Sequence, residues 1–253
     1  MSDKDLPHPE EPAQQASRKT HDSASLSEAQ PERAFFGRRK GHPLRARQEQ
    51  IFDTALPRFQ VDLDQPAGDL THLFAGPIEE VRLEIGFGGG EHLVAHAAAR
   101  PRTGFLGCEP FVNGVAGMLA LATDQELTNI RVHFGDAVDL LAWVPPGALS
   151  GIDLLYPDPW PKRRHWKRRF VQDHRIAAFA RVLRRGAEFR FASDIDDYVA
   201  WTLERFTQSD QFLWTAERAD DWRCPWPNHV RTRYEAKALT AGRKPTYLAF
   251  RRR

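Results

Sequence analysis

A glycine-rich turn with acidic neighbours is the first feature of the sequence that could bind a ligand. It spans residues 83–91 (LEIGFGGGE), and its glycines, Gly86 and Gly88 among them, let a ligand approach the backbone closely. The spacing is G-x-G-x-G and not the G-x-G-x-x-G of dinucleotide binders, because Glu91 stands three residues after Gly88. Glu84 and Glu91 would repel a pyrophosphate, which prefers bare backbone N–H groups. The turn therefore predicts a cationic ligand.

Two further acids follow later apolar stretches. Glu109 comes after residues 103–108, and Asp136 follows residues 130–134. A carboxylate at the first position can accept hydrogen bonds from ribose hydroxyls, and one at the second from an adenine amino group. Together with Glu84 they indicate a nucleoside pocket that tolerates positive charge. S-adenosyl-L-methionine carries a sulfonium, an amino group, a ribose and an adenine, so it fits; NAD is a rival because the ribose acid would serve it as well.

A proline-rich loop, residues 156–161 (YPDPWP), follows the next apolar stretch. Two prolines flank Asp158 and hold it in an extended or turned conformation. Trp160 offers a flat surface on which a base can stack. We expect Asp158 to lie where the transferred group should be, at the middle of the sheet. A rigid turn carrying a solvated acid is the alternative interpretation.

Basic residues adjoin this loop. Six of the eight residues 162–169 (KRRHWKRR) are Lys or Arg, residues 33–47 add six more, and three arginines end the chain. A run of charge usually marks a solvated face, but its junction with the proline-rich loop favours contact with a phosphate backbone. We expect a nucleic-acid substrate, although the net charge is only +2.

Two later motifs could line the same predicted site. Asp194 ends a predicted strand, and residues 232–235 (TRYE) open a predicted helix. Thr232 and Glu235 have the spacing of a capping box, which is the structural interpretation. In the functional interpretation both side chains touch the target base.

The elements that must position these residues alternate between strands and helices. Strands are predicted over residues 81–86, 103–108, 130–134, 151–156, 188–192, 212–216 and 246–251. Helices are predicted over residues 91–100, 113–122, 137–143, 169–184, 195–206 and 232–240, and Gly186 is expected to cap the fourth of them. Repeated βα units imply an α/β fold whose sheet is mostly parallel, with helices on both faces.

Composition limits the class of protein. The 253 residues fit one domain with a tail. We expect a disordered tail over residues 1–31, a basic arm and connector over residues 32–77, and the main domain over residues 78–253. No stretch approaches the ~20 apolar residues of a membrane helix, and the first thirty residues lack a secretory signal. Cys108 and Cys224 make no disulfide framework, and no H-E-x-x-H spacing suggests a metal, so a reducing cytoplasm is expected and no metal is proposed.

The glycine-rich turn, the proline-rich loop, the basic run and the TRYE motif together resemble those of the bacterial tRNA (guanine-N(7)-)-methyltransferase family. The similarity covers residues 33–251, and its most specific part is the proline-rich PDPW loop, followed by the basic run and then TRYE. It implies a Rossmann-like, seven-stranded methyltransferase sheet whose last strand is antiparallel. It also implies that S-adenosyl-L-methionine donates a methyl group to a guanine in the variable loop of tRNA, in a monomer or homodimer.

The resemblance also implies roles for particular residues. Cofactor binding falls to Glu84, Gly86, Gly88, Glu109, Asp136 and Asp158, and Asp158 is assigned the catalytic role. Substrate contacts fall to Lys162, Asp194, Thr232, Arg233, Tyr234 and Glu235. RNA contacts fall to Arg164, His165, Trp166, Lys167, Arg168 and Arg169. Pro161 departs from the family's usual residue at that position, with no consequence for the chemistry.

Guanine N(7) has an in-plane lone pair and carries no proton, so no general base need act before methyl transfer. Asp158 is then expected to orient the base and to stabilise its developing positive charge. Two alternatives stay open: the same cofactor with another RNA base or a protein side chain as acceptor, and an RNA-binding protein with a degenerate pocket.

Overall fold

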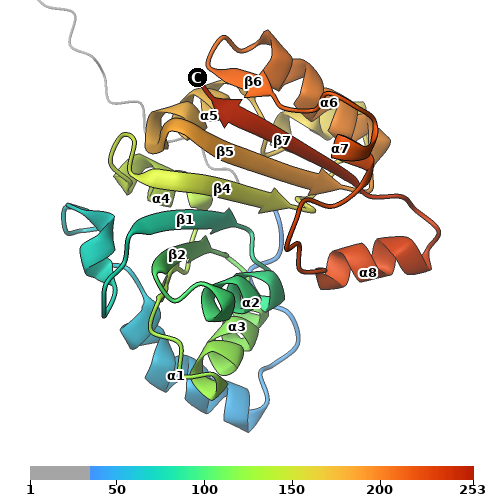
Figure 1. Cartoon of the computed structure of the whole chain (residues 1–253). Coiled ribbons are helices and arrows are strands. Elements are labelled where there is room, and N and C mark those ends of the chain that lie inside the picture. Colours follow the sequence, from blue (N-terminus) through green and yellow to red (C-terminus); the bar gives the residue numbers. More distant parts are fainter. Residues whose placement is uncertain (1–34) are drawn as a thin grey trace, which may run out of the picture. The chain divides into compact units, whose positions relative to one another are not determined.

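A single seven-stranded sheet organises the chain (Figure 1). The computed structural model describes residues 35–253, so the tail expected over residues 1–31 lies outside the described part. The strands are β1 (Glu80–Ile85), β2 (Thr103–Cys108), β3 (Ile130–His133), β4 (Leu149–Leu155), β5 (Leu183–Ser193), β6 (Phe212–Trp214) and β7 (Thr246–Arg252). Their order in the sheet is β3-β2-β1-β4-β5-β7-β6.

The direction of the strands confirms the predicted fold class. Strands β1 to β5 pair in parallel, whereas β7 runs antiparallel to both β5 and β6. The order reverses at β1, from which the chain proceeds first towards β3 and then back to β4. In such sheets ligands bind beyond the carboxyl ends of the strands at this switch point.

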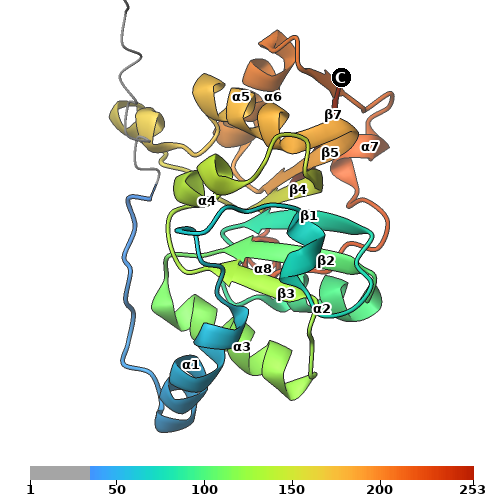
Figure 2. The same ribbon diagram turned by 90° about the vertical axis from the view of Figure 1, so that its left-hand side faces the viewer.

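Helices cover both faces of the sheet (Figures 1 and 2). Helices α2 and α3 lie on one face, and α4, α5 and α6 lie on the other. The helices are α1 (Ala46–Phe59), α2 (Glu91–Ala99), α3 (Val112–Asp124), α4 (Ala137–Trp143), α5 (Asp173–Val182), α6 (Asp196–Gln208), α7 (Asp220–Arg223) and α8 (Arg233–Thr240). Two 3₁₀ helices, η1 (Leu70–Leu73) and η2 (Arg163–Arg168), accompany them. Every helix within residues 35–253 is too short or too polar to cross a lipid bilayer.

Helix α1 is an element that the sequence analysis did not predict. Its buried residues Ala55 and Phe59 join Val115 and Leu119 of α3 in one apolar cluster. Burial of this stripe against α3 stabilises the helix, because most helical stability in proteins comes from packing of an apolar face. The connector therefore begins with a helix that extends the layer formed by α2 and α3.

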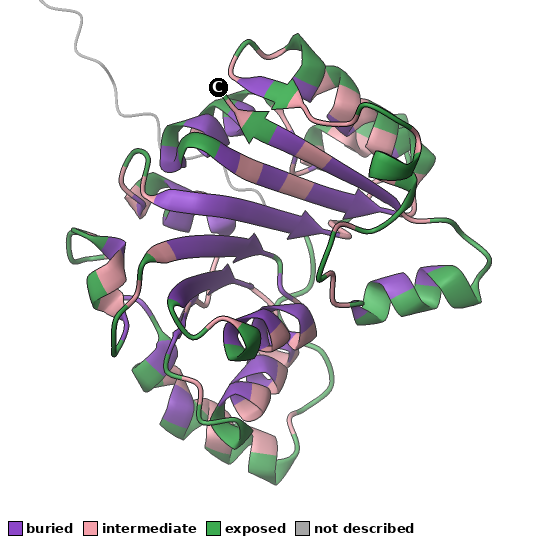
Figure 3. Cartoon of the chain, in the orientation of Figure 1, coloured by how far each residue is buried: buried purple, intermediate pink, exposed green. Residues whose placement is uncertain are grey.

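The central strands are buried almost throughout (Figure 3). On the face of α5 and α6, Phe179, Phe189, Phe206 and Phe250 stack in sequence, with ring centroids 4.7, 4.7 and 4.1 Å apart. Such stacked pairs add about 0.5–1.5 kcal/mol each beyond simple burial. This column fixes α5 and α6 against β5 and β7.

Helix α5 corrects the prediction of a helix over residues 169–184 with Gly186 as its cap. The helix begins at Asp173, because residues 163–168 form η2, and it ends at Val182, because Leu183 is already extended (φ −78°, ψ 133°). Gly186 has φ +79° and lies inside β5, where the register with β4 shifts between Leu149 and Gly151. The left-handed glycine therefore belongs to an irregularity of the strand and does not cap the helix.

Candidate functional site

A cavity of about 330 Å³ lies at the carboxyl ends of the parallel strands. Its walls include three of the predicted acids, Glu109, Asp136 and Asp158, together with glycines of the turn after β1. The predicted residues that line it are Gly86, Gly88, Glu109, Asp136, Asp158, Arg168 and Tyr234. The structure thus brings together residues from the turn after β1, the ends of β2, β3 and β4, and α8.

The glycine turn is required by close packing as well as by its backbone angles. Gly88 has φ +56°, and a Cβ atom there would lie 3.3 Å from Cε2 of Tyr234. On α3, a Cβ atom at Gly114 would lie only 2.4 Å from the carbonyl oxygen of Gly88. A side chain at Gly114 would push the turn away from α3, and one at Gly88 would press on Tyr234 of α8, so both glycines keep this wall of the cavity closely packed.

Glu109 is a buried acid that holds this turn. It accepts hydrogen bonds from the backbone N–H groups of Gly88 (2.8 Å) and Phe111 (3.0 Å), and only 7% of the residue is exposed. Desolvation raises the pKa of its carboxyl to about 7, although the two hydrogen bonds oppose this shift. Each carboxylate oxygen has a second lone pair, so Glu109 can still accept from a ligand.

The raised pKa of Glu109 makes stability depend on pH. A folded-state pKa of about 7 against 4.5 in the unfolded chain stabilises the fold below pH 4.5, and this contribution is lost as the pH rises to about 7. We expect Glu109→Gln to become more stable relative to the wild type over that interval. Urea denaturation at pH 4.5, 6 and 7.5 measures it, with the exposed Glu49→Gln as control. A stability difference that does not change with pH would contradict the assignment.

Asp136 caps α4 and also contacts the arm. Its Oδ1 accepts from the N–H of Val138 (3.2 Å), and its Oδ2 accepts from the N–H of Phe35 (2.8 Å). Residues 35–38 therefore line the cavity itself. The arm is fixed further along, where the N–H of Val112 donates to Arg39 O (2.9 Å) and Asn113 Nδ2 donates to His42 O (2.8 Å).

The contribution of residues 35–38 to the cavity was missed by the sequence analysis, which assigned the arm to RNA alone. The signal for it is the Phe35-Phe36-Gly37 triplet, because two adjacent aromatics are unusual in a solvated basic segment. Phe36 meets Trp160 edge to face, with ring centroids 6.2 Å apart. Cys108, to which the sequence analysis assigned no part in binding, also lines the cavity.

The loop that carries Asp158 is held in an uncommon conformation. Tyr156 and Trp160 at its two ends both adopt left-handed backbone angles, with φ +50° and +43°. Non-glycine residues rarely adopt such angles, and they persist where the surroundings enforce them, often at functional sites. Asp158 lines the cavity, and desolvation there raises the pKa of its carboxyl.

Arg168 of η2 lines one side of the cavity, and further basic side chains lie near it along the chain. The guanidinium of Arg168 lies 4.9 Å from the ring centroid of Trp160 and 5.4 Å from that of Phe36. His165 meets Trp160 edge to face at 5.8 Å. Three more of the predicted contact residues are exposed on this segment: Lys162, Arg164 and Lys167. We define the basic rim as Lys162, Arg164, His165, Lys167 and Arg168.

Arg169 differs in its burial from the other residues that were predicted to contact RNA, which are Arg164 to Arg168. Only 1% of it is exposed, and its guanidinium lies beneath the surface among aromatic rings. Trp166 is half-buried, and it contacts Trp201 of α6 with ring centroids 5.4 Å apart. Both residues hold η2 on the domain, whereas the side chains of the basic rim are more exposed.

The residues of α8 divide between two roles. Thr232 caps the helix by accepting from the N–H of Glu235 (3.1 Å), and half-exposed Tyr234 lines the cavity. Arg233 forms an ion pair with Glu91 (Nε–Oε1, 3.0 Å). Glu235 is 3% exposed and accepts from Tyr247 Oη (2.8 Å), so the structure places it under the helix. The expectation that Glu235 touches a substrate stays a prediction.

His229 completes the contacts of Glu235 and leaves the capping box half-formed. Its Nε2 contacts the second carboxylate oxygen of Glu235. In a reciprocal capping box, one carboxylate oxygen of Glu235 would accept from the N–H of Thr232. Here the two oxygens contact His229 and Tyr247 instead. Only the Thr232 half of the box is formed.

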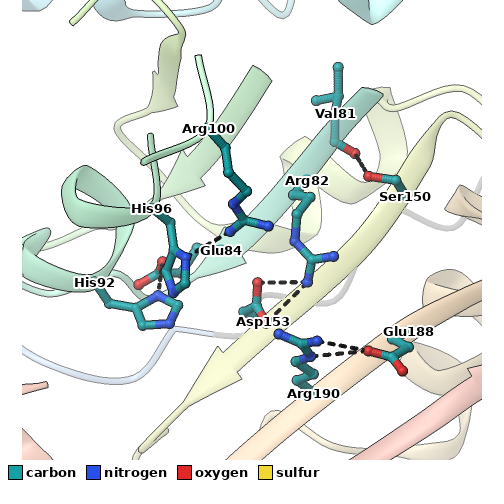
Figure 4. A network of polar contacts seen from close by, with 10 residues as sticks. All are labelled: Val81, Arg82, Glu84, His92, His96, Arg100, Ser150, Asp153, Glu188 and Arg190. Carbon is teal, nitrogen blue, oxygen red and sulfur yellow. Dashed lines mark hydrogen bonds and ion pairs between the residues drawn. The ribbon is translucent and has the colours of Figure 1, made fainter. Parts of the chain in front are cut away.

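Two further predicted residues lie outside the walls of the cavity. Glu84 points to the opposite face of β1, where its Oε2 lies 2.7 Å from Nδ1 of His92 (Figure 4). Asp194 forms an ion pair with Arg243 near the start of α6. Their assigned roles in binding remain predictions.

Glu84 belongs to a polar network on the face of the sheet that carries α2. Arg82 and Asp153 form a buried ion pair there, with Nη2 3.1 Å from Oδ2, and Arg190 pairs with Glu188 on β5 (Figure 4). Desolvation would raise the pKa of Asp153, but Arg82 and His92 hold it down at about 2. Within residues 35–253, no three His, Cys, Asp or Glu side chains are grouped so that they could hold a metal ion.

The chain is similar to known proteins along most of its length. Residues 79–248 match the family described as "Putative methyltransferase". The chain is 59% identical over 232 residues to a tRNA (guanine-N(7)-)-methyltransferase of Rhodopseudomonas palustris strain BisB18, covering 91% of this chain and 92% of the relative. A protein of the same name from strain BisB5 is 59% identical over 220 residues (87% and 86% covered). Another, from Bradyrhizobium diazoefficiens, is 58% identical over 222 residues (87% and 94% covered).

Proposed function

The chain belongs to the tRNA (guanine-N(7)-)-methyltransferase family, and from this premise we propose that it methylates N(7) of a guanine in the variable loop of tRNA, with S-adenosyl-L-methionine as donor. The observation that supports this proposal best is a juxtaposition. A cavity lined by the carboxylates of Glu109, Asp136 and Asp158 opens directly beside the basic rim. Negative charge suits a cationic donor, and positive charge suits a phosphate backbone.

The polar groups that line the cavity fit the proposed cofactor. Glu109 keeps lone pairs for a ligand after its two backbone hydrogen bonds and would hold the ribose hydroxyls, and Asp136, which also lines the cavity, would face the adenine amino group. Backbone at Gly86 and Gly88 forms the wall against which the remainder would lie. When bound, S-adenosyl-L-methionine supplies an electrophilic methyl group carried on a sulfonium.

Asp158 would act on the acceptor base. Guanine N(7) already has a free lone pair, so the residue has no proton to remove from it. Asp158 would accept hydrogen bonds from guanine N–H groups and thereby turn N(7) into line with the bond to be broken. Its negative charge would also stabilise the base as it becomes cationic. Trp160 and Tyr234 flank the cavity and offer faces on which an extruded base could stack.

Methylation of unmodified tRNA tests the function directly. We expect transcripts incubated with labelled cofactor to gain one methyl group on N(7) of a variable-loop guanine, detected by nucleoside analysis. The matched control is the same transcript with that guanine replaced by adenine, which should stay unlabelled. Label on another nucleoside would move the activity to a different RNA base. With tRNA as the substrate, we also propose a cytoplasmic location. The monomeric or dimeric state remains a prediction.

The basic rim makes a prediction about salt. Replacing Arg168 with alanine should raise the KM for tRNA and lower the slope of log affinity against log salt by about 0.7–0.9, as expected for one lost phosphate contact. Filter binding between about 50 and 200 mM salt measures this slope. Arg184→Ala, which removes an arginine near the start of β5, should leave it unchanged. An unaltered slope in the Arg168 variant would remove this residue from the RNA-binding face.

A further inference from the structure

Arg169 is a buried arginine in a run of basic residues that are mostly exposed. Its guanidinium carbon lies 4.6, 5.0 and 5.2 Å from the ring centroids of Trp166, Tyr198 and Trp201. No carboxylate within residues 35–253 forms an ion pair with it. Burial of a guanidinium without a carboxylate partner is costly, so its hydrogen bonds must compensate for part of that cost.

The hydrogen bonds of Arg169 join the Asp158 loop to α6. Its Nε donates to the carbonyl oxygen of Pro159 (3.0 Å), and its Nη1 donates to the carbonyl oxygen of Asp197 (3.1 Å). Pro159 directly follows Asp158, and Asp197 lies in the first turn of α6. The guanidinium therefore connects the residue next to Asp158 with a helix that is packed on the core.

The loop needs such support because of its own sequence. Pro157 and Pro159 have no N–H groups, so carbonyls are the main backbone groups through which other elements can hold this loop. Trp160, whose N–H belongs to the peptide that Arg169 contacts, has a left-handed φ of +43°. A non-glycine residue in that region is strained and persists only where the surroundings fix it. The hydrogen bond from Arg169 to Pro159 is one such constraint.

We propose that Arg169 is a positioning residue for methyl transfer, which fixes the Pro159–Trp160 peptide and thereby the position of Asp158. The proposal rests on the proposed function, in which Asp158 orients the acceptor base. It distinguishes two adjacent arginines: Arg168 faces outward over Trp160 and Phe36, whereas Arg169 faces inward. Their substitution should therefore affect different steps.

Arg169→Met provides the main test, because methionine keeps much of the volume among the rings and removes both hydrogen bonds. We expect kcat to fall about 10- to 100-fold, the effect of a small misplacement of a catalytic group. The KM for tRNA and the salt slope should stay within about twofold of the wild type. Arg168→Ala, the adjacent comparator, should instead raise the KM for tRNA and lower the salt slope. Arg169→Lys should recover part of kcat, because an ammonium group can still donate to Pro159.

A second measurement does not depend on activity. Hydrogen exchange at the amides of Asp158 and Trp160, measured without substrate, should be faster in Arg169→Met and intermediate in Arg169→Lys, while exchange in β1 and β4 stays unchanged. If the methionine variant does not fold, the lysine variant decides by the same two measurements. If the wild type methylated no tRNA, the proposed function would fail, and exchange in the loop would still show whether Arg169 fixes it.

The opposite results are equally definite. A wild-type kcat with wild-type exchange in the folded variant would overturn the proposal. A raised KM for tRNA and a reduced salt slope, with kcat unchanged, would also overturn it and return Arg169 to the RNA-binding surface.

Discussion

Replacing Asp158 with alanine is expected to lower kcat by about 10²- to 10³-fold, the usual effect of removing one electrostatic group from a preorganised site. Affinity for tRNA should change by less than about twofold, because the phosphate contacts come from the basic rim. Single-turnover methylation gives the rate, and filter binding gives the affinity. Asp158→Asn adds a distinction: asparagine keeps a hydrogen-bond acceptor but loses the charge, so it separates orientation from electrostatic stabilisation.

The control for Asp158 is Asp64→Asn, a change at an exposed acid that does not line the cavity. It should leave both the rate and the affinity unaltered. Equal losses of tRNA binding and turnover in the Asp158 variants would show that this residue supports the complex and not the reaction.

The second large effect concerns stability. Asp153→Asn should lower the free energy of unfolding by about 3–5 kcal/mol, because the change leaves Arg82 as a buried charge without its partner. The side chains of Arg82 and Asp153 are only 10% and 8% exposed, so water cannot replace the lost interaction. Urea denaturation at pH 7 measures the change.

The matched control is the exposed ion pair of Arg47 and Asp124, whose side chains are 75% and 56% exposed. Asp124→Asn should cost less than about 1 kcal/mol. The effect of Asp153→Asn should also shrink at low pH. The lowered pKa of Asp153 stabilises the fold above its ordinary value of 3.8, and this contribution disappears as the pH falls to about 2. If Asp153→Asn and Asp124→Asn lowered the free energy of unfolding equally, burial would not be what makes the Arg82–Asp153 pair important.

Much of the fold could be predicted from local sequence. Strand β2 and helix α4 have the predicted bounds, because apolar runs and polar punctuation are local signals. The convergence of Glu109, Asp136 and Asp158 on one cavity was equally predictable, since parallel strands end at one edge of a sheet. The position of Glu84 was also encoded: strand residues alternate in direction, and Ile85, its neighbour, lines the cavity.

The remaining features depend on contacts that no local pattern reveals. Arg168 and Arg169 are identical and adjacent, and the contacts that hold one of them inward include the rings of Tyr198 and Trp201, some thirty residues later. Likewise, Glu235 fits a capping box by spacing, but Tyr247 on β7 attracts its carboxylate elsewhere. Tertiary partners thus overrode both interpretations drawn from spacing.

The strand order has a consequence for synthesis of the protein. The last strand, β7, lies between β5 and β6, so β6 has no neighbour in the sheet until the final residues have been made. Helix α8 is joined to β7 and depends on Tyr247 for the contact with Glu235. A chain emerging from the ribosome can therefore pair strands β1 to β5 first, and the edge formed by β7 and β6 is completed last. Even a short C-terminal truncation should therefore leave β6 unpaired while β1 to β5 keep their neighbours.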